Sequence, residues 1–198
     1  MEKKKHHHGD LREALIRAGL ELLEEGGPGA MTLRKCAGRA GVSHAAPAHH
    51  FSGLISLQAA IIVRGYRIFT EEMQAHRAIA ADNPRAQLLA ICAGYLVFAA
   101  RHGALFRYMF QDFSESRNEV DDQVLEDLHA ESAAAYAELR SACAPFEPLN
   151  GVDQGIETLV WSLVHGYAML FAGKPNSETP AGPIPDLSQI LPEFPLRK

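Results

Sequence analysis

The chain has 198 residues, 47% of them hydrophobic and 22% charged, which is the composition of a folded protein rather than a mainly disordered one. Its longest apolar stretch, residues 88–100, is too short for a membrane-spanning helix of about 20 residues, so no membrane association is expected. Residues 1–52 carry eight Lys/Arg against six Asp/Glu, and residues 53–198 carry eleven against eighteen, so only the amino-terminal part is suited to a polyanion.

A first helix is expected from Asp10, whose carboxylate would cap it, to the glycines at 26–29. A second, short helix capped by Thr32 should run to about Arg39. Gly41 then permits a turn with positive φ, and Ser43 would cap a third short helix. This spacing is typical of a helix-turn-helix.

Helical periodicity continues to the end of the body, and no alternating run is long enough to predict a sheet, so the fold class is all-α. Helices are expected at about 53–80, 84–102, 104–110, 119–143 and 153–172. Six of the eleven prolines lie from Pro175 onward, which predicts an extended or partly disordered tail. The sequence therefore divides into a three-helix domain at 1–52 and a helical bundle at 53–198, with a Pro-rich tail from about 175.

The third helix has the features of a DNA-contacting element. Ser43 would leave its amino end pointing outward, with free N–H groups suited to phosphate. The small or hydrogen-bonding side chains of His44, Ala45 and Ala46 could then face base edges in a major groove.

The amino-terminal residues resemble the DNA-binding domain of TetR-family regulators, whose pattern is T-L-R, then A-x-x-A-G-V-S, then H-F. Here these are Thr32-Leu33-Arg34, residues 37–43 and His50-Phe51, and residues 7–12 also look like a start seen in this family. Residues 161–166 are similar to a W-x-x-x-H-G motif in one of its branches. The resemblance implies a homodimer that binds a double-stranded DNA operator and is released from it by a small-molecule effector.

Two positions depart from the family pattern. The family usually has Tyr three residues before the Phe and Lys three after it, both used on phosphates, whereas this chain has Ala48 and Leu54. Phosphate contacts should then fall more heavily on the basic and polar side chains that remain. These are Arg12, Thr32, Arg34, His49, His50 and the lysines 3–5.

The resemblance also implies an effector cavity in the body, and His102, Trp161 and His165 are the polar groups expected to line it. Such side chains are also common in a core when one hydrogen bond satisfies them. The last two long helices are the expected dimer seam, with small residues at 133–135 permitting close approach.

Other interpretations of the sequence are weaker. An enzyme is not expected, because no nucleophile lies in a recognisable turn and neither a carboxylate pair nor an HExxH motif occurs. No cofactor or metal is expected either, since the three cysteines form no CxxC pair and adjacent histidines at 6–8 do not preorganise a site. The alternative is a helical ligand-binding or redox-sensing module, which would need Cys36 to be exposed. With no apolar stretch behind the basic start, a cytoplasmic location is expected.

Overall fold

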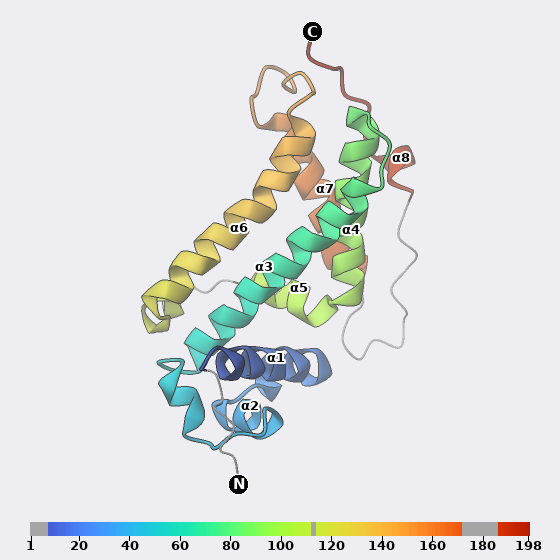
Figure 1. Ribbon diagram of the computed structural model, residues 1–198. Helices are drawn as coiled ribbons and strands as arrows, with labels where there is room; N and C mark the ends of the chain where they lie inside the picture. The colour runs from blue at the N-terminus through green and yellow to red at the C-terminus, as the bar shows by residue number, and fades with distance from the viewer. Residues whose placement is uncertain (1–7, 112–113, 172–185) are drawn as a thin grey trace.

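The computed structural model describes residues 8–111, 114–171 and 186–198, which form a small helical head and a larger helical body (Figure 1). Apart from two isolated β-bridges, the regular structure in these ranges is helical, which confirms the all-α class. None of the helices in these ranges is by itself long and apolar enough to cross a membrane; α4 and α5 together meet that test but are bent by 109°.

The head consists of α1 (His8–Gly26), a 3-10 turn η1 (Pro28–Ala30), α2 (Leu33–Arg39) and a second 3-10 turn η2 (Ala46–His49). Because α1 begins at His8, Asp10 lies inside the helix, and the expectation that it is the capping residue is wrong. The cap of α2 is as expected, since the Thr32 hydroxyl oxygen accepts a 3.1 Å hydrogen bond from the Lys35 amide.

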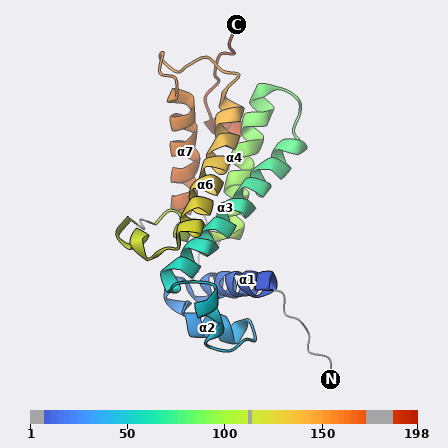
Figure 2. The same cartoon turned by 60° about the vertical axis from the view of Figure 1, so that its left-hand side comes forward.

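The body contains α3 (Leu54–Ala78), α4 (Pro84–Arg101), α5 (Gly103–Met109), η3 (Ser114–Glu119), α6 (Asp122–Cys143), α7 (Gly155–Phe171) and α8 (Leu187–Ile190). Asn83 caps α4 by accepting a 2.9 Å hydrogen bond from the Ala86 amide, and Pro84 occupies the first turn, as the sequence predicts. The long helix α3 packs most extensively against α4 and α6, while α7 covers the other side of α4 and α6 (Figure 2).

The last residues of the chain, 186–198, pack against the body, although the proline content predicts an extended or partly disordered tail. Residues 172–185 lie outside the described part of the chain, but residues 186–198 dock onto the body. The Arg85 guanidinium donates to the carbonyl oxygens of Leu191 and Pro192 at 2.5 and 2.6 Å. Phe194 packs edge-on against Phe146, with ring centroids 5.7 Å apart. Buried apolar side chains and satisfied carbonyls therefore fix a segment in which prolines prevent a long helix.

The axes of α3 and α4 come unusually close at Gly94. A Cβ atom added to Gly94 would lie 2.7 Å from the Met73 Cα and 2.8 Å from the Glu72 carbonyl oxygen. Both are backbone atoms, so they cannot move aside as the end of a side chain could. The absence of a side chain at Gly94 thus sets the separation of the two helices.

We expect Gly94→Ala to lower the free energy of unfolding by about 1–3 kcal/mol, because the methyl group would push α3 and α4 apart. Gly38→Ala on α2 is the matched control, since a Cβ there meets nothing within 4 Å and alanine favours the helix. Urea unfolding followed by circular dichroism measures both. Equal stability of Gly94→Ala and the wild type would contradict this account of the helix contact.

Candidate nucleic-acid interface and ligand cavity

The turn between α2 and η2 has the backbone geometry of a helix-turn-helix. Gly41 has φ +70°, in the left-handed region that the sequence predicts for it. The Val42 amide donates to the Ala37 carbonyl oxygen at 3.0 Å, which closes the turn. Ala37 and Cys36 are fully buried beneath it, so the turn is fixed on the core of the head.

The third helix of the head is shorter than expected. It is a single 3-10 turn whose N-cap is Ala45, with no side-chain capping bond, so the expectation that Ser43 caps it is wrong. Pro47 accounts for this change, because it lacks an N–H group and disfavours the α conformation in the residue before it. The Pro47 carbonyl oxygen instead accepts from the amides of His50 and Phe51 at 2.9 and 3.0 Å.

Phe51 anchors the end of this segment. Its ring is 2% exposed, and the Arg12 guanidinium of α1 lies 5.3 Å from the ring centroid. This cation–π contact ties α1 to the segment that follows η2. Arg12 therefore has a structural contact in addition to the phosphate contact expected from the sequence.

The head brings the sequence-predicted contact residues together on α1, α2 and the η2 segment. Six of the nine have exposed side chains, namely Thr32, Arg34, Ser43, His44, Ala45 and His49. Arg12, Ala46 and His50 are half-buried. The lysines at 3–5 lie outside the described residues.

Arg39, also on α2, has a different role. Its guanidinium donates two 2.6 Å hydrogen bonds to the Glu25 carboxylate, and these bonds hold α2 against α1. Cys36 is completely buried, and burial raises the pKa of its thiol. A buried, protonated thiol is a poor target for oxidants, so the exposure that a Cys36 redox switch needs is missing.

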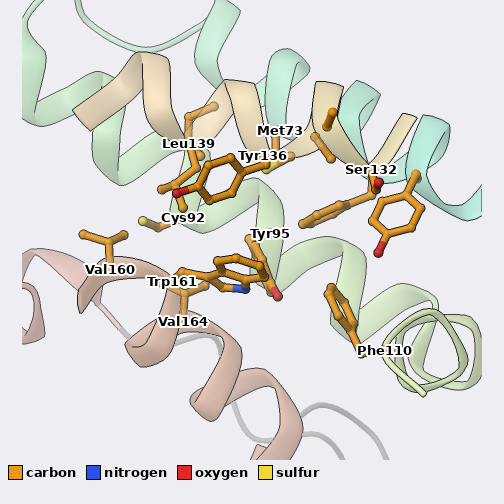
Figure 3. A pocket seen from close by; sticks show the side chains of 15 residues that line it. Met73, Cys92, Tyr95, Phe110, Ser132, Tyr136, Leu139, Val160, Trp161 and Val164 are labelled. Atoms are coloured by element: carbon orange, nitrogen blue, oxygen red, sulfur yellow. The ribbon is translucent and has the colours of Figure 1, made fainter. Parts of the chain in front are cut away.

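The body has a cavity of about 480 Å³, partly open to solvent, between α3, α4, α6 and α7 (Figure 3). This volume is in the range of small-molecule sites. Much of its wall is aromatic, formed by Tyr66, Phe69, Tyr95, Phe110, Tyr136 and Trp161. Met73, Leu139, Val160 and Val164 complete most of the apolar wall.

Of the three residues predicted to line an effector cavity, only Trp161 is in the wall of this one. Trp161 is part of the wall, and its side chain lies beside that of Tyr95 (Figure 3). His165 is one layer behind, with its Nδ1 atom 2.7 Å from the Tyr95 hydroxyl. His102 ends α4 on the side of the head, where its Nδ1 atom is 3.8 Å from the Glu24 carboxylate, and it is not among the lining residues.

Sequence reasoning did not single out Tyr66 or Tyr136 for the cavity. Both occur on amphipathic helices where an aromatic residue is expected in the core, so neither carries a local signal. They line the same cavity only because of how α3 and α6 pack against each other, and the sequence of one helix does not predict that packing.

Comparison with known proteins identifies the body. Residues 88–183 match the family described as "Tetracyclin repressor-like, C-terminal domain". The HTH-type transcriptional regulator BetI of Stenotrophomonas maltophilia (strain R551-3) is 32% identical over 110 residues, which are 56% of this chain and 56% of that protein. The match thus spans little more than half of that relative.

Solved structures extend the similarity to the head. A protein of unknown function from Rhodococcus sp. RHA1 is 29% identical with a TM-score of 0.68, covering 90% of this chain and 91% of that one. The TetR family transcriptional regulator PfmR from Thermus thermophilus shares the fold, at 17% identity and a TM-score of 0.58, over 83% of this chain and 86% of that one. The body is therefore similar to the C-terminal domain of TetR-family regulators, and the chain as a whole has the fold of that family.

A carboxylate at the start of α6 holds the segment that joins head and body. Asp121 is the N-cap residue of α6, yet its side chain makes no capping bond to that helix. It accepts instead from the Ser56 hydroxyl and, at 3.3 Å, from the Ser52 amide. Partial burial raises the pKa of Asp121, but the hydrogen bonds from Ser52 and Ser56 outweigh it and leave that pKa below its ordinary value.

A second carboxylate joins head and body on the opposite side of α3. Glu24 of α1 accepts from the amides of Ala104 and Leu105 in the first turn of α5, at 3.3 and 3.4 Å. These amides would otherwise lack helical partners. The head is therefore joined to the body by α3 itself and by the side chains of Asp121 and Glu24.

We expect Asp121→Ala to speed amide hydrogen exchange in residues 52–57 about fivefold, since a partly exposed bond of this kind contributes roughly 1 kcal/mol. Hydrogen-exchange mass spectrometry of the whole chain measures it. Because the folded-state pKa of Asp121 is lowered, its stabilising contribution is present above about pH 4 and is lost as the pH falls below that value.

The neighbouring Asp122→Ala is the control, because that side chain is exposed and lies one residue further along α6. Equal protection of residues 52–57 in the two variants would show that Asp121 does not hold this segment.

Proposed function

We propose that this protein is a cytoplasmic, homodimeric DNA-binding regulator rather than an enzyme, and that a small-molecule effector releases it from its operator, which makes it a repressor. Residues 1–52 would form the DNA-binding domain and residues 53–198 the effector and dimerisation domain. The observation that carries this proposal is the helix-turn-helix of the head, with its exposed basic and small side chains.

The exposed surface of the head is suited to a duplex. Ala45 and Ala48 are exposed and small, so the η2 segment can approach the floor of a major groove. His44 and His49 flank them with groups that can hydrogen-bond to bases or phosphates. Arg34, exposed in the first turn of α2, would hold a phosphate beside the groove.

A homodimer would place two such heads on one pseudo-palindromic site, about one DNA turn apart or slightly more. Exposed apolar side chains of α7 support self-association, because Leu170 is 69% exposed and Met169, Phe171 and Trp161 are also exposed. An apolar surface of this kind usually marks an interface. The exposed Ala133 and Ala134 on α6 would let a second copy approach closely.

Effector binding would reach the heads through helices that are part of both regions. Wall residues of the cavity lie on α3 and α6, and the same two helices meet at Asp121 beside the head. An effector that favours one spacing of α3 and α6 would thereby favour one position of the head. Its effect is limited to its difference in affinity between the DNA-competent and released forms.

We expect Arg34→Ala to weaken binding to an operator selected from random DNA, with about one unit less slope of log K against log salt concentration. Loss of one phosphate contact should affect all sequences equally. The control is Arg140→Ala on α6, an exposed arginine in the last turn of a body helix. Titration by fluorescence anisotropy at several salt concentrations measures both variants, and an unchanged slope for Arg34→Ala would argue against the proposed contact.

We expect Leu170→Glu to convert the dimer to a monomer, because the charge would be buried without a partner in the α7 seam. Ile79→Glu is the control, since Ile79 is 87% exposed at the end of α3, away from α7. Sedimentation velocity distinguishes the two states. A Leu170→Glu protein that remained dimeric would exclude this part of α7 from the interface.

A further inference from the structure

The wall of the body cavity is uncharged. Within the described part of the chain, its fifteen lining residues include no Asp, Glu, Lys, Arg or His. An ion entering this space would lose its hydration without gaining a counter-charge, which is costly in an apolar environment. The wall composition therefore selects against charged ligands.

Several polar atoms of the wall are hydrogen-bonded to groups that lie behind it. The Tyr95 hydroxyl lies 2.7 Å from His165 Nδ1 and can donate a hydrogen bond to it. Burial lowers the pKa of His165, so its imidazole is neutral and can accept that bond.

The two named residues of the W-x-x-x-H segment have different contacts. His165 ties α7 to α4 through the Tyr95 hydroxyl, and Trp161, about one turn before it on α7, lines the cavity.

On the other side of the cavity, the polar side chains of the wall are also hydrogen-bonded within the protein. The Tyr136 hydroxyl donates to the Glu157 carboxylate at 2.7 Å, and the Ser132 hydroxyl donates to the His129 carbonyl oxygen at 3.1 Å. Glu157 is buried behind Tyr136 and is not part of the wall, so it is not available to pair with a cationic ligand.

Tyr66 differs from these residues. No hydrogen-bond partner for its hydroxyl is found in residues 8–111, 114–171 and 186–198, and its ring packs edge-on against Phe110 with centroids 6.4 Å apart. A ligand group could therefore bind this hydroxyl without breaking an existing bond.

We propose that the cavity takes an uncharged, mainly apolar, ring-containing molecule and that the Tyr66 hydroxyl binds its single hydrogen-bonding group. The aromatic side chains provide flat apolar surfaces for such rings. This inference rests on the proposed function only in treating the ligand as the effector. Binding in the cavity can be measured without DNA.

Trp161 provides the measurement, because it is the only tryptophan in the chain and lines the cavity. Three probes share one skeleton and differ in charge: biphenyl-4-methanol, biphenyl-4-carboxylate and biphenyl-4-ylmethylammonium. We expect the neutral alcohol to change the tryptophan fluorescence of the full-length protein with a Kd at least about tenfold lower than either ion. Equal or tighter binding of an ion, or no binding of the alcohol, would overturn the proposal.

A second pair of measurements tests Tyr66. Tyr66→Phe should weaken binding of the alcohol about threefold to tenfold and leave binding of 4-methylbiphenyl, which lacks the hydroxyl, unchanged. If Tyr66→Phe binds the alcohol as the wild type does, Tyr66 is not the anchor.

The site itself is tested by filling it. Ser132→Phe, at a half-buried lining position on α6, should abolish the fluorescence change for the alcohol, whereas Ala130→Phe, exposed on the same helix and not in the wall, should retain it. Retained binding by Ser132→Phe would place the ligand elsewhere and overturn the proposal.

Addition of the alcohol to the protein–operator complex separates this inference from the proposed function. Binding in the cavity without release of DNA would leave the ligand class intact and contradict effector-controlled release. Release by the alcohol and by both ions at similar Kd values would support effector control and overturn the charge selectivity.

Discussion

A single helix, α3, is part of the core of both the head and the body. Near its start, Leu57 and Ile61 are fully buried, and Ile61 lies against α1 at Gly19. Near its end, Phe69 and Met73 line the cavity. Because an α-helix is stiff over 25 residues, neither region can reorient without displacing buried side chains of the other. The position of the head therefore depends on how α3 packs in the body.

Two carboxylates reinforce this arrangement from either side. The Asp121 side chain makes no capping bond to α6, although such a bond usually contributes about 1 kcal/mol. It accepts hydrogen bonds from the Ser52 amide and the Ser56 hydroxyl instead. Glu24 provides hydrogen-bond acceptors for the first amides of α5. Both contacts are polar and partly exposed, so they can break and reform at lower cost than the buried contacts of α3. Such contacts suit the joint that the proposed function requires between head and body.

Most helices can be predicted from the sequence because their signals are local. Thr32 and the Asn83-Pro84 pair mark helix starts through bonds to amides three residues away, and these bonds are present. The effect of Pro47 is larger than the sequence suggests, since it replaces an α turn by a 3-10 turn in a short helix. Cavity residues could be predicted only in part, because Tyr66 and Tyr136 line one cavity only through the packing of helices that are far apart in sequence.

The seventeen-residue helix α7 has apolar side chains both toward the cavity and toward the outside of the body. Its inner side presents Trp161 and Val164 to the cavity, and its outer side exposes Met169 and Leu170. Trp161 itself is 40% exposed, so it belongs to both sides. Under the proposed function, a substitution on α7 that changed ligand preference would also change the surface available for self-association, and a substitution in that surface would change the cavity. Divergence among paralogues should therefore proceed by paired substitutions on α7 rather than by independent drift of its two faces.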